Sequence, residues 1–304
     1  MVPCYNAEHY VKRALDSVFA QTYRQFHIYA VDDGSTDNTV QVLQRNGDRC
    51  CVVSQRHSGA AAARNRAIRM SDSVFVAFLD ADDEWLPAKL ERQVTLMKRD
   101  PSLGLVCTSC AVRGDQHHSE AVFALPDLPV SGRLFRDLVR NCFIVTPTVV
   151  VRRRCLEEAG LFNESLSVCE DFNLWLKIAA RWRIAFLPEV LATTYKHRES
   201  LSANISAEDR LRTGVASLED VLCKCPQLSR SEANALRTAL AERNYFYGSF
   251  LLSSGANRRA RHSLASALKL QPFHWRAMVK LGLSLLPADA SKPLVGWQRT
   301  FADR

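Results

Sequence analysis

Three aspartates, Asp80, Asp82 and Asp83, stand directly after the apolar run 74–79. A short apolar run of this kind is typical of a buried strand. Because side chains two residues apart in an extended chain point the same way, Asp80 and Asp82 can approach one ligand. Carboxylate oxygens suit Mg²⁺ or Mn²⁺, especially when phosphate oxygens complete the coordination shell. The cluster therefore predicts a site for a divalent metal and a phosphate-bearing ligand.

A second acidic pair, Asp32 and Asp33, follows the apolar run 26–31. In an open α/β sheet, ligands bind beyond the carboxyl ends of the strands. The alternative is that these aspartates only cap turns and helices, and we prefer that interpretation for Asp37. Carboxylates at the ends of two strands favour a binding site.

The elements that must position these residues alternate along the first half of the chain. Apolar residues at helical spacing alternate with short apolar runs, which predicts an α/β domain: a Rossmann-like, mostly parallel sheet with helices on both faces. From residue 206 onward the sequence is almost wholly helical, and residues 247–272 resemble one tetratricopeptide-type hairpin. The predicted helices are 11–19, 60–70, 88–97, 152–159 and 171–180, and the predicted strands are 26–31, 50–53, 74–79, 105–112 and 149–151.

Composition narrows the class of protein. The 304 residues are 47% hydrophobic with a formal net charge of +8, and the basic residues are dispersed, which disfavours a nucleic-acid partner. No apolar stretch has the length of a membrane span, and no signal peptide is expected. The ten cysteines, including Cys107 and Cys110, are interpreted as structural thiols of a reducing compartment. We expect a cytoplasmic protein, with peripheral contact at the inner membrane face.

A series of motifs in a fixed order makes the sequence similar to the family 2 glycosyltransferases. The similarity covers about residues 2–202 and implies an A-type nucleotide-sugar-binding fold (GT-A) over 1–205, with a nucleotide-binding half at 1–100 and an acceptor half at 101–205. Residues 206–304 would form a helical C-terminal region. The motifs are Pro3 to Asn6, Val31 to Asp37, Gly59 to Asn65, Phe78 to Asp83, Thr146 to Arg153, Gly160 to Phe162, Glu170-Asp171 with Leu174 to Leu176, and Tyr195 with His197, Ser200 and Ser202.

The resemblance implies roles for five residues at the nucleotide. Pro3 and Tyr5 would line the base pocket, with Tyr5 against the nucleobase. Asp33 would accept a hydrogen bond from the base, and Asp32 would support its loop. Arg64 could approach the nucleotide.

The resemblance also implies roles nearer the reaction. Asp82 would bind the divalent metal, Mn²⁺ or Mg²⁺, and Asp80 would lie near the metal or the ribose. Asp171 would be the general base that takes the proton of an acceptor hydroxyl. His197 would reach the diphosphate or close a loop over the donor. The alternative for Asp171 is a purely structural role as an N-cap, because the predicted helix begins there.

The implied reaction is inverting transfer of a sugar from a nucleoside-diphosphate sugar, with a UDP-sugar as the expected donor. The acceptor would be a glycan or a lipid-linked saccharide in polysaccharide or glycolipid assembly. Two alternatives stay open: a non-catalytic scaffold whose helical tail binds a protein partner, and a nucleotidyltransferase. The second would normally have a glycine-rich basic loop near the N-terminus, which residues 3–10 lack.

The sequence departs from the family at its start. A full apolar strand normally precedes the Pro-x-Tyr-Asn motif, whereas only Met1 and Val2 precede Pro3. That strand is expected at the centre of the sheet, so a short one should leave apolar surface uncovered and backbone groups unpaired. We expect either an upstream start or a truncated form.

Overall fold

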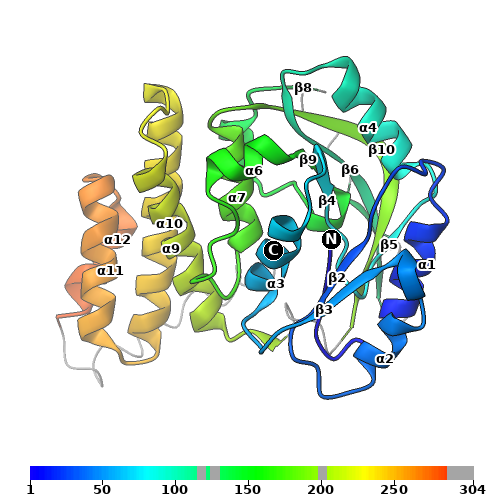
Figure 1. Cartoon of the computed structure of the whole chain (residues 1–304). Coiled ribbons are helices and arrows are strands. Elements are labelled where there is room, and N and C mark those ends of the chain that lie inside the picture. Colours follow the sequence, from blue (N-terminus) through cyan, green and yellow to red (C-terminus); the bar gives the residue numbers. More distant parts are fainter. Residues whose placement is uncertain (115–120, 124–130, 198–203, 286–304) are drawn as a thin grey trace. The chain divides into compact units, whose positions relative to one another are not determined.

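The computed structural model describes residues 1–114, 121–123, 131–197 and 204–285 (Figure 1). The contacts of the chain divide it into two compact units, Met1–Asn204 and Ile205–Arg304. Among the described residues, no helix has the length and apolar character needed to cross a membrane. The assignment of a nucleotide-binding half and an acceptor half within the first unit stays a prediction.

The first unit opens with three parallel strands in the order β1-β2-β3. Helices α1 and α2 lie on one side of these strands and α3 lies on the other (Figure 1). The predicted bounds of α1 and α3 are confirmed, because their apolar residues recur at helical spacing on one buried face. The elements are β1 (Val2–Cys4), α1 (Val11–Phe19), β2 (Tyr29–Asp32), α2 (Thr39–Gln44), β3 (Cys51–Ser54) and α3 (Ala60–Met70).

Strand β1 ends the three-stranded sheet, but it has backbone hydrogen bonds on both sides. It pairs with β2 on one side. On the other side, the Met1 ammonium donates to the Ala77 carbonyl at 2.9 Å and the Leu79 amide donates to the Met1 carbonyl at 3.1 Å. Burial lowers the pKa of the Met1 amino group to about 5.

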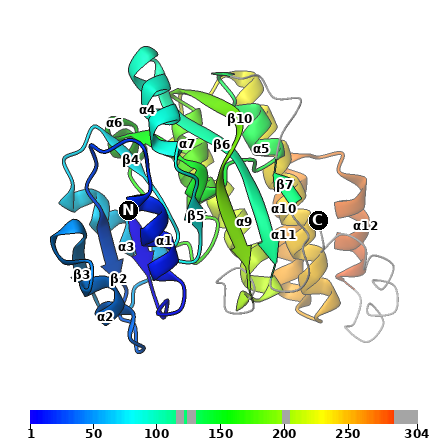
Figure 2. The same cartoon turned by 90° about the vertical axis from the view of Figure 1, so that its right-hand side faces the viewer.

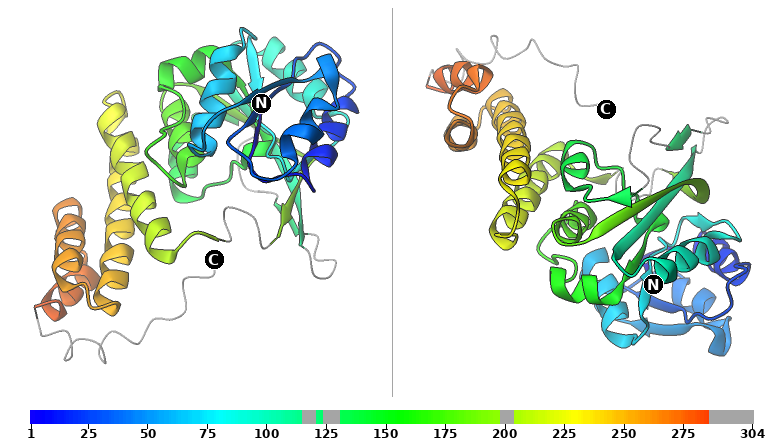
Figure 3. Two further views of the ribbon diagram at one scale, coloured as in Figure 1. Left: turned by 60° about the horizontal axis from the view of Figure 1, so that its bottom comes forward. Right: turned by 90° about the horizontal axis from the view of Figure 1, so that it is seen from above.

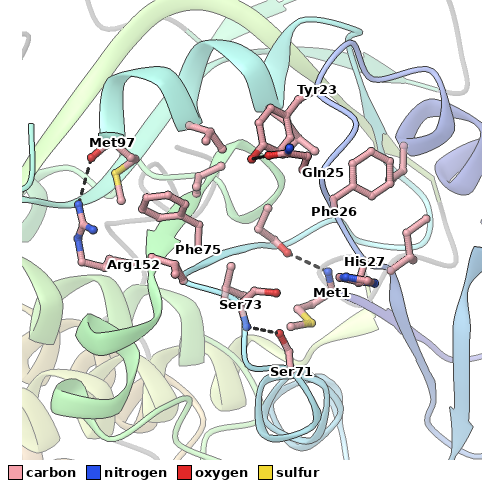
Figure 4. A pocket seen from close by; sticks show the side chains of 18 of the residues that line it. Met1, Tyr23, Gln25, Phe26, His27, Ser71, Ser73, Phe75, Met97 and Arg152 are labelled. Carbon is pink, nitrogen blue, oxygen red and sulfur yellow. Dashed lines mark hydrogen bonds between the residues drawn. The ribbon is translucent and has the colours of Figure 1, made fainter. Parts of the chain in front are cut away.

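Beside Met1 lies a cavity of about 520 Å³. Its wall is mostly apolar, and Phe26, Phe75 and Met97 are among the side chains around it (Figure 4).

The second sheet has the order β4-β9-β6-β10-β5, with β7 beside β6 and β8 beside β10. Only β6 and β10 are parallel among its described pairs. The predicted α/β class is confirmed, but this sheet is mixed because β9 enters antiparallel between β4 and β6. The strands are β4 (Phe75–Ala77), β5 (Glu84–Trp85), β6 (Leu103–Gly114), β7 (Ala121–Phe123), β8 (Ser131–Gly132), β9 (Val150–Arg152) and β10 (Arg183–Lys196).

Helices cover both faces of this sheet. Helices α6 and α7 lie on one side and α4 lies on the other (Figures 1 and 2). Gly160 ends α6 in the left-handed conformation, with φ +85°, as its position after the predicted helix requires. The helices are α4 (Lys89–Arg99), α5 (Phe135–Arg140), α6 (Arg153–Ala159) and α7 (Glu170–Ala179).

The second unit is a row of helices in which each packs on the next (Figure 3). Ser229 caps the longest of them in a capping box with Glu232. Where the hairpin pattern was identified, a Cβ on Gly248 would lie 2.7 Å from Leu264 Cγ, so the glycine permits close approach. The helices are α9 (Ala207–Lys224), α10 (Arg230–Ser253), α11 (Asn257–Leu270) and α12 (Trp275–Leu283).

Candidate functional site

The acidic cluster lies in the turn that joins β4 to β5. The side chains of Asp80 and Asp82 are partly exposed, at 29% and 27%. Asp83 is buried, and its carboxylate accepts a hydrogen bond of 3.0 Å from the Tyr195 amide. Asp83 therefore holds the turn against β10. The carboxylates of Asp80 and Asp82 stay partly exposed, so a ligand can reach them.

Arg64 on α3 joins this cluster to a distant part of the chain. Its side chain is 7% exposed, and its two terminal nitrogens lie 2.6 Å from Asp80 Oδ1 and 2.7 Å from Glu170 Oε1. The end of β4 and the first turn of α7 therefore meet at one guanidinium. Burial raises the pKa of Glu170, the neighbouring Asp171 raises it further, and Arg64 opposes both effects.

Asp171 lies in the first turn of α7, which begins at Glu170. The N-cap position belongs to Cys169, so the alternative that Asp171 is the N-cap is wrong. One carboxylate oxygen of Asp171 accepts its hydrogen bond from the Thr146 hydroxyl at 2.8 Å, and the other accepts from the Phe172 amide at 2.6 Å. These two contacts fix the orientation of the carboxylate.

A cluster of three buried aromatic residues packs beneath the contact between the acidic turn and α7. Phe78 packs edge-on against Phe162 at a centroid distance of 5.3 Å, and both rings contact Trp175 of α7. Because Phe78 lies two residues before Asp80 and Trp175 follows Asp171 by one helical turn, the cluster holds the two acidic segments at a fixed separation.

His197 lies directly against the acidic cluster. Its Nε2 lies 2.8 Å from Asp82 Oδ2, and its ring stacks on Tyr10 at 4.6 Å. Burial raises the pKa of Asp82, and the charge of Asp80 adds to the effect. Arg13 donates to the Asp82 carbonyl at 2.6 Å. The Asp82 side chain thus faces a buried imidazole in a region crowded with negative charge.

The segment after β2 forms a second, separate part of the site. Asp33 is buried, and its carboxylate accepts hydrogen bonds from Gln55 Nε2 at 2.7 Å and from the amides of Ser58 and Gly59 at 2.9 and 2.8 Å. His57 Nδ1 lies 2.9 Å from the same carboxylate. Asp33 thereby fixes the loop that precedes α3.

Tyr5 lies over this loop. Its ring is 48% exposed and stacks on the His57 ring at a centroid distance of 4.1 Å. Pro3 pairs with Val31 in the sheet next to it. The two stacked rings form an exposed aromatic surface of the kind on which a nucleobase packs.

Asp32, the last residue of β2, supports the turn that follows this strand. Its carboxylate accepts a hydrogen bond of 3.2 Å from the Ser35 amide. Gly34 has φ +80°, and a Cβ there would lie 2.8 Å from the His57 amide nitrogen, so only glycine fits.

Few side chains in the site could coordinate a metal ion. Within the described ranges, no group of three or more His, Cys, Asp or Glu side chains is arranged to hold a metal ion. Asp82 and His197 nonetheless present a carboxylate and an imidazole to one point. The carboxylate suits Mn²⁺ or Mg²⁺ when the diphosphate of a donor supplies further oxygen ligands, whereas the imidazole favours Mn²⁺ over the oxygen-binding Mg²⁺.

The structure brings most of the sequence-predicted residues into three contact groups. Their individual roles stay predictions. The motif residues Ser200 and Ser202 lie outside the described residues. Sequence reasoning missed the contacts of His57, Tyr10, Arg13 and Thr146; His57 stands two residues before Gly59, and Thr146 opens one of the family motifs. The three groups are Asp80 with Arg64 and Glu170, Asp82 with His197, and Asp33 with His57 and Tyr5.

Solved structures share this fold. S. aureus TarS 1–349 in complex with UDP-GlcNAc superposes with a TM-score of 0.69 at 21% identity, over 97% of this chain and 87% of that one. The mannosyltransferase PcManGT from Pyrobaculum calidifontis, in complex with GDP-Man and Mn²⁺, gives a TM-score of 0.55 at 20% identity, over 98% of this chain and 86% of that one. The fold is therefore of the GT-A type.

Two relatives illustrate the similarity in sequence. An uncharacterized glycosyltransferase of Rickettsia typhi is 28% identical over 65% of this chain, and the match spans 63% of that protein's length. The UDP-Glc:alpha-D-GlcNAc-diphosphoundecaprenol beta-1,3-glucosyltransferase WfgD of Escherichia coli is 32% identical over 59% of this chain and 68% of its own length. This chain thus spans less than two thirds of the rickettsial relative.

The model of the glycosyl transferase family 2 matches residues 1–160. That range holds more than half of the chain and includes both acidic clusters and Arg64. The chain belongs to glycosyl transferase family 2.

Proposed function

We propose that this chain is an inverting glycosyltransferase, which moves a sugar from a nucleoside-diphosphate sugar to an acceptor hydroxyl. The observation that carries the proposal is the position of Arg64 between Asp80 and Glu170. Because Asp171 directly follows Glu170, this contact brings the carboxylate suited to an acceptor proton close to the carboxylates suited to a metal-bound donor diphosphate.

A UDP-sugar is the proposed donor. TarS is described with UDP-GlcNAc and WfgD is named for UDP-Glc. In this chain, the uracil would pack on the exposed ring of Tyr5, next to His57 and the loop that Asp33 fixes. Stacking recognises the flat face of the base, and the polar atoms of the loop can recognise its edge.

Asp82 and His197 are the proposed metal ligands. A divalent cation held by this pair would supply positive charge that offsets the charge developing on the leaving diphosphate. The manganese in the PcManGT structure supports the choice of metal. Arg13 and Asp83 hold the backbone of the same turn, and this fixes the position of Asp82 beside His197.

Asp171 is the proposed general base. It takes the proton of the acceptor hydroxyl while the hydroxyl oxygen forms a bond to the anomeric carbon. The bond from that carbon to the diphosphate oxygen breaks in the same step, and the nucleoside diphosphate leaves with the electron pair. One direct displacement inverts the anomeric configuration. Thr146 and the Phe172 amide orient the carboxylate for this role.

The proposed acceptor is a saccharide in glycan or glycolipid assembly. WfgD is named for an acceptor sugar on diphosphoundecaprenol, a lipid carrier. This chain would therefore take a hydroxyl of a glycan or of a lipid-linked saccharide.

A panel of nucleotide sugars tests the proposal. The protein is incubated with each donor, with and without Mn²⁺, and release of the nucleoside diphosphate is measured together with the anomeric configuration of the product by NMR. We expect release from at least one UDP-sugar, and an inverted product. Absence of release from every donor would favour the scaffold alternative, and release of pyrophosphate from a nucleoside triphosphate would favour a nucleotidyltransferase.

A further inference from the structure

The last two described helices carry charge of one sign. Residues 257–285 contain six basic residues and no aspartate or glutamate. The two units together have a net charge of +8, so this short segment holds a large share of the excess. The six residues are Arg258, Arg259, Arg261, Lys269, Arg276 and Lys280.

The same segment exposes large apolar side chains. Phe273 is 92% exposed and Trp275 is 65% exposed, although side chains of this size are normally at least half covered. Met278, Val279 and Leu285 are exposed as well. A group of exposed apolar side chains that is bordered by polar residues is typical of a surface that binds another protein or a membrane.

The spacing of residues on α12 sorts them onto three faces. Ala277 and Leu281, four residues apart, pack against the α10 and α11 residues Tyr245 and Leu264. Trp275, Met278 and Val279 recur at helical spacing on a different face, which is exposed. Among the described helices, α12 packs on α10 and α11 through its buried side (Figures 1 and 3).

The basic side chains adjoin this exposed face. Arg276 and Lys280 are four residues apart and lie between the buried face and the exposed apolar face of α12. The guanidinium of Arg276 lies 5.7 Å from the Trp275 ring centroid. Exposed Lys269 belongs to the end of α11, immediately before.

We propose that α12 and the turn before it, residues 271–285, dock on the surface of an anionic lipid bilayer. A helix that is anchored in the interface buries an apolar face at the level of the acyl chains and keeps basic residues near the head groups. Tryptophan favours this depth because its ring is amphipathic. Lys and Arg beside an anionic leaflet add electrostatic attraction.

The charge pattern favours lipid over the other occupants. A second copy of this chain on the same face would bring the same basic residues together, because a two-fold contact is made of one patch on both subunits. A protein partner would need an acidic surface whose shape is complementary to this helix. A bilayer meets both requirements, since it offers apolar depth and negative charge over a flat area.

Vesicle flotation of the full chain tests the proposal. Vesicles of phosphatidylcholine alone are compared with vesicles that contain about 30% phosphatidylglycerol. We expect the protein to float with the anionic vesicles, and to be released at about 0.5 M salt, where exposed charges are screened. The inference does not depend on the transfer reaction, because the measurement is of binding alone.

Three variants locate the surface. Arg276→Glu with Lys280→Glu should weaken binding by about tenfold or more, because four units of charge change. Trp275→Ala should weaken it as well. The matched control, Arg230→Glu with Arg237→Glu, makes the same charge change on exposed residues of α10 and should bind like the unmodified protein. Circular dichroism and thermal melting establish that each variant is folded.

Several outcomes would overturn the proposal. One is equal recovery of the protein from neutral and anionic vesicles, or none from either. Another is α12 variants that float like the control. A third is a dimer in light scattering that the Trp275→Ala change converts to a monomer, since the face would then contact a second copy.

Discussion

At the scale of single residues, Arg64 is the group on which the geometry of the site depends. It is buried and holds two carboxylates that belong to different segments. A buried ion pair adds little net stability when intact, but removal of one partner leaves uncompensated charge in a low-dielectric region. Arg64 is therefore both a structural tie and the residue that sets the distance between the acidic turn after β4 and the start of α7.

Replacement of Arg64 by methionine should be costly for folding. Methionine keeps most of the volume and removes the charge, so Asp80 and Glu170 lose their partner. We expect a loss of about 3 to 5 kcal/mol in the free energy of unfolding, measured by urea denaturation. The double variant Arg64→Met with Glu170→Gln should recover part of the loss. A single variant within about 1 kcal/mol of the parent would mean that the ion pairs carry little of the stability.

His57 should contribute to nucleotide affinity and not to the chemical step. It stacks on Tyr5 and contacts Asp33, so His57→Ala removes one wall of the proposed base site. Stacking of an aromatic side chain on a base is worth about 1 to 3 kcal/mol. The Kd for UDP should therefore rise by about tenfold, with kcat little changed. His27→Ala, at an exposed histidine of the same unit, is the control. A kcat that falls while the Kd holds would place His57 elsewhere in the mechanism.

Sequence reasoning reached the carboxylates and missed their partners. Asp33 and Asp82 stand after apolar runs, and this local pattern is sufficient to find them. The pairing of Arg64 with Glu170 joins residues far apart in the chain, and no local pattern encodes it. Tyr10 is ordinary in sequence, and Thr146 opens a motif that does not show its contact with Asp171; both reach the site because their segments fold toward it.

At the scale of elements, helices α1 and α3 were predicted with correct bounds and helices α4, α6 and α7 to within two residues, whereas the long strand β10 was missed. Pro188 interrupts its sequence, and the structure has a register shift between Leu187 and Val190 where the strand pairs with β6. A bulge of this kind breaks the alternation from which a strand is predicted. The strand is stabilised by its neighbours on both sides, which a local pattern does not contain.

Lys89, the first residue of α4, is a buried lysine that lowers the stability of the folded state. Lys89 is fully buried, its Nζ has no hydrogen-bond partner among the described residues, and it lies 4.4 Å from the Trp85 ring centroid. Burial lowers its pKa well below the usual value of a lysine. The folded state therefore binds fewer protons than the unfolded state, so stability rises with pH until the unfolded lysine also loses its proton.

Lys89→Met should stabilise the protein. At pH 7 we expect a gain on the order of 2 kcal/mol, because a polar group without a partner is replaced by an apolar one of similar length. The gain should shrink as the pH approaches about 10, near the pKa of an unfolded lysine. Thermal melts across this range measure it. Lys98→Met, at an exposed lysine of the same helix, should change stability little. A loss of stability in Lys89→Met would show that the amine has a favourable role in the fold.

At the scale of the whole molecule, the GT-A unit and the helical unit have separate cores. The first unit carries the family signature and the candidate site. The second contributes the basic, apolar surface on α12. The class of each unit was predictable from periodicity, whereas the mixed order of the second sheet was not, because strand pairing depends on contacts between distant segments.

Ligand binding should stabilise the molecule most when nucleotide and metal are both present. A ligand that binds only the folded state adds about 2.7 kcal/mol at a hundred times its Kd. UDP with Mn²⁺ should therefore raise the melting temperature measurably, and UDP with a chelator should raise it less. In Asp82→Ala the difference between the two conditions should vanish. A shift that is the same with Mn²⁺ and with chelator would remove Asp82 and His197 from a metal site.

The most direct test of the site is the turnover of Asp171→Asn. This change keeps the size of the side chain and removes its ability to accept the acceptor proton. With a donor that the unmodified protein consumes, we predict that kcat falls by about 10² to 10⁴ while the Kd for UDP holds. Asp72→Asn, at an exposed aspartate of the same unit, should behave like the unmodified protein. Turnover by Asp171→Asn within about twofold of that control would contradict the account, because the proton would then be taken by another group.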